Sequence, residues 1–198
     1  CGPIICSSRW DTLKLASCGK ATTRMEVRID SPDPKTHAGE IVCRGANMML
    51  GYYKNPEATA QIIDVNGWLH TGDLGVMDEE GYVTVRGRSK NMLLTSSGQN
   101  IYPEEIEGKL NNMPYVSESL IVLQHDKLVA LIYPDFDDAF AHGLQQTDIE
   151  KAMEANRNEL NLLLPAYCQI TKVKIHFEEF EKTAKKSIKR FMYQEAKG

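Results

Sequence analysis

The chain has 198 residues, of which 42% are hydrophobic and 25% charged, a composition typical of a globular protein with one domain or two small ones. Its formal net charge of −4 lacks the basic excess expected of a nucleic-acid-binding protein, so no nucleic-acid partner is predicted. No apolar run approaches the ~20 residues that a transmembrane helix requires, and five cysteines without C-x-x-C spacing favour free thiols in a reducing, cytoplasmic compartment.

The first half of the chain is predicted to consist mainly of short strands and loops. Residues 25–30 alternate apolar and polar side chains, which indicates a half-buried strand, and residues 39–45 indicate a second strand bounded by glycines. Residues 55–63 have a proline near their start and good helix formers after it, so they predict a short helix. Residues 73–86 predict a β-hairpin around the turn Asp78-Glu79-Glu80-Gly81.

The second half is predicted to alternate helices and strands, which makes the fold class α+β. We expect strands over residues 91–95, 120–123, 128–132 and 173–177, and helices over residues 103–111, 147–163 and 185–196. The two central strands are apolar at successive positions, which indicates a sheet covered on both faces. Thr147-Asp148-Ile149-Glu150 matches a capping box at the start of its helix. The change in character near Lys90 predicts a domain boundary with a short hinge.

Several single residues could carry chemistry, each with a simpler structural alternative. Asp73, in a Thr-Gly-Asp turn, could accept hydrogen bonds from a ribose diol, or it could satisfy local backbone N–H groups. Arg88 is a fork-shaped donor suited to phosphate or ribose oxygens, or a surface ion-pair partner. Gly98 would let a thin ligand pass close to the backbone, or it is a plain turn glycine.

The lysine-rich tail could place a cation on a phosphate, although such a run is usually a solvated helix face. Its basic residues are Lys182, Lys185, Lys186, Lys189 and Arg190. The five histidines lack ligand spacing, so no metal site is predicted from them.

Taken in order, the motifs resemble the adenylate-forming superfamily, which comprises acyl-CoA synthetases, the adenylation domains of peptide synthetases and luciferases. The motifs are residues 39–45 (GEIVCRG), 51–59 (GYYKNPEAT), 67–75 (GWLHTGDLG), 87–90 (GRSK) and 98–107 (GQNIYPEEIE). The resemblance implies that residues 1–88 are the β-rich end of the large AMP-binding domain. It implies that residues 89–198 are a small mobile C-terminal domain with a mixed sheet flanked by helices.

The resemblance also implies a reaction and roles for single residues. A carboxylate attacks the α-phosphate of ATP to give an acyl-adenylate and pyrophosphate, and the thiol of coenzyme A then displaces AMP. The match assigns Asp73 to the ribose hydroxyls, Arg88 to the nucleotide, Lys90 to the hinge and Gly98 to a loop lining the pantetheine tunnel. Mg²⁺ is expected to accompany ATP, with no ligands identified in this chain.

Two departures from the family pattern qualify the match. The family's phosphate loop and its aromatic-x-Thr-Glu motif are absent, and the chain opens on Cys1, so we expect a piece of a longer polypeptide that is inactive without its N-terminal part. The family's late lysine lies in a Thr-x-Thr-Gly-Lys-x-Lys-Arg pattern. An ungapped alignment places Ser187 at that lysine and Lys186 at the glycine, whereas a one-residue shift gives the role to Lys186, with Lys189 as the fallback.

Within the superfamily, the loop at Gly98 and its spacing from Arg88 resemble long-chain fatty acid CoA ligases more than peptide-synthetase modules. The expected function is therefore a part of an ATP-dependent fatty acid CoA ligase. The competing hypothesis is a non-catalytic nucleotide-binding or regulatory relic that kept the fold and lost the lysine.

Overall fold

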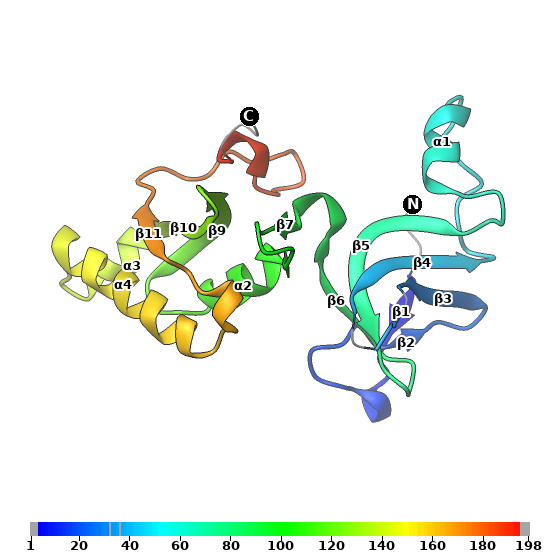
Figure 1. The fold of residues 1–198 in the computed structure, drawn as a ribbon, viewed down its shortest axis with the longest axis horizontal. Coiled ribbons are helices and arrows are strands. Elements are labelled where there is room, and N and C mark those ends of the chain that lie inside the picture. The colour runs from blue at the N-terminus through cyan, green and yellow to red at the C-terminus, as the bar shows by residue number, and fades with distance from the viewer. Residues whose placement is uncertain (1–3, 32, 36, 195–198) are drawn as a thin grey trace. The chain divides into compact units, whose positions relative to one another are not determined.

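The computed structural model of the protein describes residues 4–31, 33–35 and 37–194. The chain divides into two compact units, Cys1–Lys90 and Asn91–Gly198, called unit 1 and unit 2 below. In Figure 1, unit 1 runs from blue to green and unit 2 from green to red. Each unit has its own hydrophobic core and is described by itself.

Unit 1 is built on a four-stranded antiparallel sheet in which the strands lie side by side in chain order. Its strands are β3 (Met25–Asp30), β4 (Gly39–Gly45), β5 (Leu69–Met77) and β6 (Val83–Arg88). The smaller elements are β1 (Cys6–Ser7), η1 (Trp10–Thr12), β2 (Lys20–Ala21) and the helix α1 (Pro56–Ile62). The predicted strands 25–30 and 39–45, the hairpin and the short helix are confirmed.

Local chemistry explains these elements. Met25 and Ile29 of β3 are buried while the alternate residues Glu26 and Asp30 are exposed, as the period of two requires. The helix α1 begins at Pro56, where the missing N–H costs no hydrogen bond, and the side chain of Asn55 accepts from the backbone N–H of Ala58 at 3.0 Å.

Unit 2 contains a mixed three-stranded sheet flanked by helices, and the fold class predicted from the sequence is confirmed. In the order β11–β10–β9, β10 is antiparallel to β9 and parallel to β11. The sheet strands are β9 (Val116–Gln124), β10 (Lys127–Pro134) and β11 (Lys172–Ile175), and the α-helices are α2 (Pro103–Leu110), α3 (Phe136–Ala141) and α4 (Gln146–Leu162). The remaining elements are η2 (Ser89–Asn91), which spans the division, β7 (Leu93–Leu94), β8 (Asn100–Ile101), η3 (Ala166–Cys168) and η4 (Arg190–Met192).

Both faces of the central strands of unit 2 are covered, as predicted. On one face, Ile121 and Ala130 belong to a core shared with Met153 of α4. On the other face, Leu120 and Val129 lie in a second core with other buried side chains, namely Val122, Leu131 and Phe180. Alternate residues of one strand therefore enter two different cores, which explains the apolar run in the sequence.

Two helix boundaries differ from the sequence analysis. The helix α4 begins at Gln146, and the carboxylate of Asp148 accepts from the N–H of Gln145 at 3.2 Å, so the cap lies two residues before Thr147. Leu163 lies just beyond the helix and is 63% exposed, so the helix ends one residue earlier than predicted. Just after the division between the units, the strand expected over residues 91–95 is limited to Leu93–Leu94.

The predicted last helix, residues 185–196, is wrong over its described part. Only η4 is helical there, while Lys182 and Ile188 form an antiparallel bridge and Lys186 has a left-handed backbone with φ +59°. Tertiary contacts of the flanking residues, described below, override the helix propensity of the lysines. Residues 195 and 196 lie outside the described residues.

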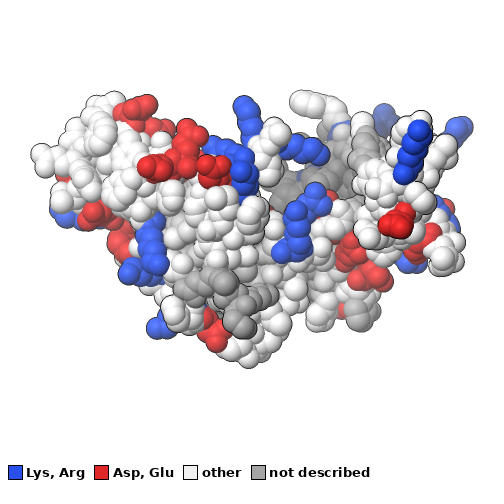
Figure 2. Space-filling view, turned by 90° about the horizontal axis from the view of Figure 1, so that it is seen from above, with Lys and Arg blue, Asp and Glu red and all other residues white. Residues whose placement is uncertain are grey.

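Figure 2 shows acidic and basic side chains interspersed on one face of the described chain. No helix within the described residues is long and apolar enough to cross a bilayer.

Candidate functional site

The Thr-Gly-Asp turn is a bulge in strand β5. The pairing of β5 with β4 shifts between Glu40 and Val42, so residues 71–73 of β5 all face Ile41. At the centre of the bulge Gly72 has φ +73°, a left-handed conformation that side chains with a Cβ disfavour. The sequence motif therefore marks a place where the ladder opens and Asp73 is re-aimed.

A network of hydrogen bonds holds this bulge in place. The N–H of Gly72 donates to Oε1 of Glu40 at 2.8 Å, and Oε2 of the same carboxylate lies 2.7 Å from Nδ1 of His70. The hydroxyl of Thr71 accepts from the N–H of Asp73 at 3.0 Å. The N–H groups of Gly72 and Asp73 thus both find side-chain partners at the bulge.

Asp73 and Arg88 lie directly opposite each other on β5 and β6. Nε of Arg88 is 3.0 Å from Oδ1 of Asp73, and Nη1 of Arg88 donates to the carbonyl oxygen of Thr71 at 3.0 Å. A Cβ on Gly72 would lie 3.3 Å from Nη1 of Arg88, so glycine allows this close approach. The structure brings the two predicted nucleotide residues together.

The exposure of this pair limits what it contributes to stability. The side chain of Arg88 is 50% exposed and that of Asp73 is 39% exposed. An ion pair at such a site contributes ~0.2–1 kcal/mol to folding, because water screens it. What it does provide is a carboxylate and a guanidinium in fixed positions at the surface, where a ligand can reach them.

Lys90 and Gly98, predicted for the hinge and the tunnel loop, both lie on exposed turns. Lys90 is the last residue of unit 1 and lies in η2 with an exposed side chain. Gly98 lies in the turn between β7 and β8, where its N–H donates to the carbonyl oxygen of Thr95 at 2.9 Å and its φ is +78°. A Cβ on Gly98 would meet no atom of the described residues within 4 Å, so its backbone conformation, rather than crowding, favours glycine.

The late lysines lie on a hairpin of residues 181–189, called the lysine hairpin below. The N–H of Thr183 donates to the carbonyl oxygen of Ser187 at 2.8 Å, and that of Lys189 donates to the carbonyl oxygen of Glu181 at 2.7 Å. Nζ of Lys189 is also 3.3 Å from Oε2 of Glu181, whereas the side chain of Lys186 at the tip is exposed. The two candidate cations therefore differ, because Lys189 has an acidic partner.

The conformation of Lys186 bears on the alignment that the sequence left open. A left-handed residue with a Cβ costs about 1–2 kcal/mol, and glycine largely avoids this cost. Lys186, with φ +59°, therefore has the backbone expected of a glycine position. This geometry favours the ungapped alignment, in which Ser187 stands where the family pattern has its lysine.

Two acidic residues that position these segments were not predicted from the sequence. Glu40 supports the bulge, and Glu107 forms a buried ion pair with Arg190 at 2.8 Å. Glu107 follows Ile106 and precedes Leu110 on the buried face of α2. An acid on the apolar face of a helix signals a buried partner, but the sequence does not identify that partner.

Metal binding finds no support in the described part of the chain. Among residues 4–31, 33–35 and 37–194, no group of three or more His, Cys, Asp or Glu side chains could hold a metal ion.

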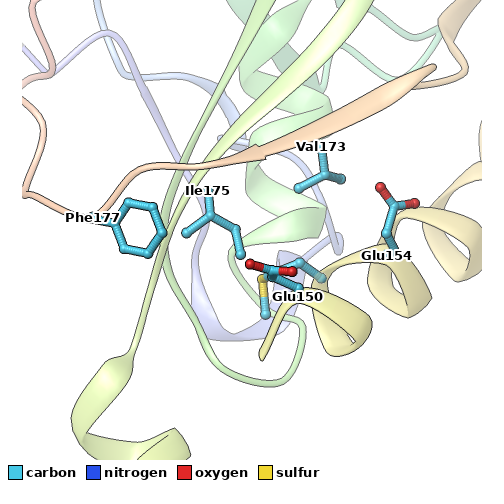
Figure 3. A pocket seen from close by; sticks show the side chains of 6 residues that line it. Glu150, Glu154, Val173, Ile175 and Phe177 are labelled. Carbon is cyan, nitrogen blue, oxygen red and sulfur yellow. The ribbon is translucent and has the colours of Figure 1, made fainter. Parts of the chain in front are cut away.

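A cavity of about 330 Å³ lies between α4 and β11 in unit 2 (Figure 3). It is lined by Glu150, Met153, Glu154, Val173, Ile175 and Phe177. One of its acids, Glu154, is paired with Arg157 at 2.7 Å, and none of the candidate residues lines it. We assign no part of the reaction to this cavity.

Comparison with known proteins places these features in a family. Residues 90–196, more than half of the chain, match the AMP-binding enzyme C-terminal domain. The chain is 33% identical to Probable acyl-activating enzyme 9 of Arabidopsis thaliana, over 98% of the chain and 38% of that protein. It is 40% identical to a long-chain-fatty-acid–CoA ligase of Escherichia coli over 60% of the chain and 22% of that protein.

Among solved structures, the anthranilate CoA ligase AuaEII in complex with anthranoyl-AMP has a TM-score of 0.76 and 25% identity. The match covers 96% of the chain and 35% of that structure. The chain thus spans less than two fifths of the length of each of these three proteins.

Proposed function

Because the chain belongs to the adenylate-forming enzymes through its AMP-binding C-terminal domain, we propose that it is part of an ATP-dependent acyl-CoA ligase. In the proposed reaction, an oxygen of a carboxylate substrate forms a bond to the α-phosphorus of ATP, and pyrophosphate leaves. The thiolate of coenzyme A then attacks the acyl carbon, and AMP leaves. Neither step changes an oxidation state, so ATP, the acid and coenzyme A are sufficient reactants.

The observation that carries this proposal is the fixed Asp73–Arg88 pair on the bulged strand, with its 3.0 Å ion pair. The carboxylate of Asp73 has oxygens that can accept from both hydroxyls of a ribose. Arg88 holds that carboxylate through Nε and can turn further N–H groups toward the nucleotide. Both side chains are partly exposed, so a ligand can reach them without opening the fold.

Two further roles follow from the same proposal. Lys90 is the pivot between residues 1–88 and residues 89–198, and Gly98 lies on the loop that meets the pantetheine arm of coenzyme A. The cation that stabilises charge on the α-phosphate comes from the lysine hairpin, with Lys186 as the first candidate and Lys189 as the fallback. A fixed cation at a charge that grows in the transition state lowers the barrier, which is why its position matters.

We further propose a fatty acid as the acyl substrate. The similarity to the long-chain-fatty-acid–CoA ligase of Escherichia coli supports this choice, whereas the similarity to an anthranilate CoA ligase favours aromatic acids as the first alternative. The acyl pocket would lie in the N-terminal part of the longer polypeptide, so the chain described here is expected to be inactive alone. The odd number of cysteines without C-x-x-C spacing supports a cytoplasmic location.

Pyrophosphate exchange into ATP by the full-length protein tests the proposal directly. We expect exchange that depends on an added fatty acid, measured with labelled pyrophosphate across short-, medium- and long-chain acids and aromatic acids. The 198-residue chain alone serves as the control and is expected to give none. An absence of exchange with every carboxylate would refute the ligase proposal.

One observation favours a second candidate, a nucleotide-binding relic without adenylation activity. The left-handed backbone of Lys186 supports an alignment with Ser187, not a lysine, at the family's late lysine position. A relic would bind AMP or ATP through Asp73 and Arg88 but would catalyse no exchange. Calorimetric titration with AMP, alongside the exchange assay, separates the two candidates.

A further inference from the structure

We infer that Arg190 is a positioning residue that fixes the lysine hairpin on the sheet of unit 2, and that Glu104 joins this anchor to Asn91, the residue after the proposed pivot. The inference rests on the proposed function in one respect, namely that the hairpin delivers the cation. The anchoring itself is a property of unit 2 and can be tested without activity.

The guanidinium of Arg190 is held by a buried fork. Its Nη1 and Nη2 each lie 2.8 Å from an oxygen of Glu107, and both side chains are only 11% exposed. Nη1 also donates to the carbonyl oxygen of Ile121 at 3.0 Å, while the N–H of Ile121 donates to Glu107 at 2.7 Å. The end of the hairpin is thus bonded to α2 and β9 together.

A buried ion pair is a costly way to gain stability, because both charges must leave water. Apolar side chains of similar volume often stabilise such a site at least as well. The fork does differ from apolar packing in one way, since its paired bonds define both the direction and the distance of the backbone that carries it. This favours a positioning role for Arg190.

The other end of the lysine hairpin is fixed as well. Phe180 is 2% exposed and its ring lies edge-on to that of Tyr193 at 5.2 Å. The hydroxyl of Tyr193 accepts from the N–H of Glu181 at 2.8 Å, and Nζ of Lys182 lies 2.9 Å from Oε1 of Glu118. Between these anchors, residues 183–187 are exposed. The hairpin is therefore a short exposed tip on a fixed base.

Glu104 connects this base to the start of unit 2. The side-chain amide of Asn91 donates to Oε1 of Glu104 at 2.6 Å, and Nη2 of Arg190 lies 4.0 Å from the same oxygen. The second oxygen, Oε2, is buried and has no hydrogen-bond partner among the described residues. A carboxylate with one oxygen unpartnered in this way is sensitive to the position of Asn91, which donates its hydrogen bond, and of Arg190, which carries the nearby positive charge.

The consequence is that residues far apart in the sequence move as one body. Asn91 follows Lys90 directly, and Arg190 closes the lysine hairpin, yet both face one carboxylate of α2. In a rotation about Lys90, the hairpin tip would therefore keep its position relative to the rest of unit 2.

Limited proteolysis of the 198-residue chain tests the anchoring. Trypsin cleaves after Lys185 and Lys186 at the hairpin tip, and after Arg157 in α4, which reports on global opening. In Arg190→Ala we expect tip cleavage to rise about tenfold relative to cleavage after Arg157, because loss of the anchor lets the hairpin open locally while α4 stays folded. Arg190→Lys, which keeps the charge but not the fork, should give a smaller rise, and the exposed control Lys151→Ala none.

Asn91→Ala removes the hydrogen bond to Glu104. It leaves the buried ion pair between Arg190 and Glu107 intact. We expect a selective rise in tip cleavage of about threefold. If Arg190→Ala unfolds the unit, the tip and Arg157 are cleaved together, and Arg190→Lys and Asn91→Ala decide the question. Equal rises at both sites in these two variants, or no rise at the tip, would overturn the inference.

Activity of the full-length protein gives a second and separate readout. Arg190→Lys should lower kcat for pyrophosphate exchange at unchanged KM for ATP, while thioester formation from a supplied acyl-adenylate stays near the parent rate. If the parent shows no exchange at all, the proposed function fails, and the proteolysis result still decides whether Arg190 anchors the hairpin.

Discussion

The left-handed backbone at Lys186 yields the sharpest prediction, because a matched control lies next to it. Lys186 has φ +59°, whereas its neighbour Lys185 is not among the described residues with positive φ, although both are exposed. Glycine at Lys185 should destabilise the chain by about 0.5–1 kcal/mol through the entropy of the unfolded state. Glycine at Lys186 incurs the same cost but relieves about 1–2 kcal/mol of left-handed strain.

Lys186→Gly should therefore be more stable than Lys185→Gly by about 1–2 kcal/mol. Urea unfolding of the 198-residue chain, followed by circular dichroism, measures the free energy of unfolding of both variants relative to the same parent. Equal destabilisation by the two substitutions would show that Lys186 is not held in the left-handed conformation. The argument for the ungapped alignment would then fail.

The same position decides between the two candidate functions. In the full-length protein, Lys186→Gly combined with Ser187→Lys moves the cation by one residue, to the place where the family pattern has it. If Lys186 already reaches the phosphate, Lys186→Ala should lower exchange by about 10²–10³, the range seen when one electrostatic contact is lost. The double variant should then lose exchange as well, because it lacks Lys186.

A relic predicts a different pair of results, namely no exchange in the parent and measurable exchange in the double variant. If Lys186→Ala stays fully active, the cation comes from elsewhere. Lys189→Ala is then the next variant to measure.

Three further predictions concern unit 1. Asp73→Ala should change the free energy of unfolding by less than ~1 kcal/mol. It should weaken AMP binding to the full-length protein about tenfold or more. An unchanged affinity in calorimetry would exclude Asp73 from the site. Gly72→Ala should cost about 1–2 kcal/mol in urea unfolding, because φ is +73° and its Cβ would press on Arg88; a neutral effect would mean that the bulge is not required. Burial raises the pKa of the Cys6 thiol from 9.0 to about 11, and the neighbouring thiols add to the shift. Because the thiolate is the reactive form, the alkylation rate of Cys6 should be low at pH 8 and keep rising up to about pH 11. Mass spectrometry after iodoacetamide treatment checks this, and labelling as fast as at the exposed Cys18 would contradict it.

Much of the secondary structure could be predicted because it depends on local pattern. The alternation in residues 25–30, the Asn55-Pro56 helix start and the two apolar runs at 120–132 each express a rule that acts within a few residues. Segments whose conformation depends on distant partners were predicted less well. Residues 185–194 have the composition of a helix but are mostly a hairpin and turns, because Phe180 and Arg190 are anchored to other parts of unit 2.

For the candidate site, the sequence by itself identified the residue types and their order, from Thr71-Gly72-Asp73 through Arg88 to the late lysines. The spacing of such motifs can be read directly from the sequence. Only the tertiary structure decided that Asp73 faces Arg88 across a bulge supported by Glu40. It alone paired Glu107 with Arg190 across 83 residues and gave Lys186 the backbone of a glycine. Hydrogen bonds between distant segments and the sign of a single φ depend on how the chain folds back on itself, and no local pattern encodes them.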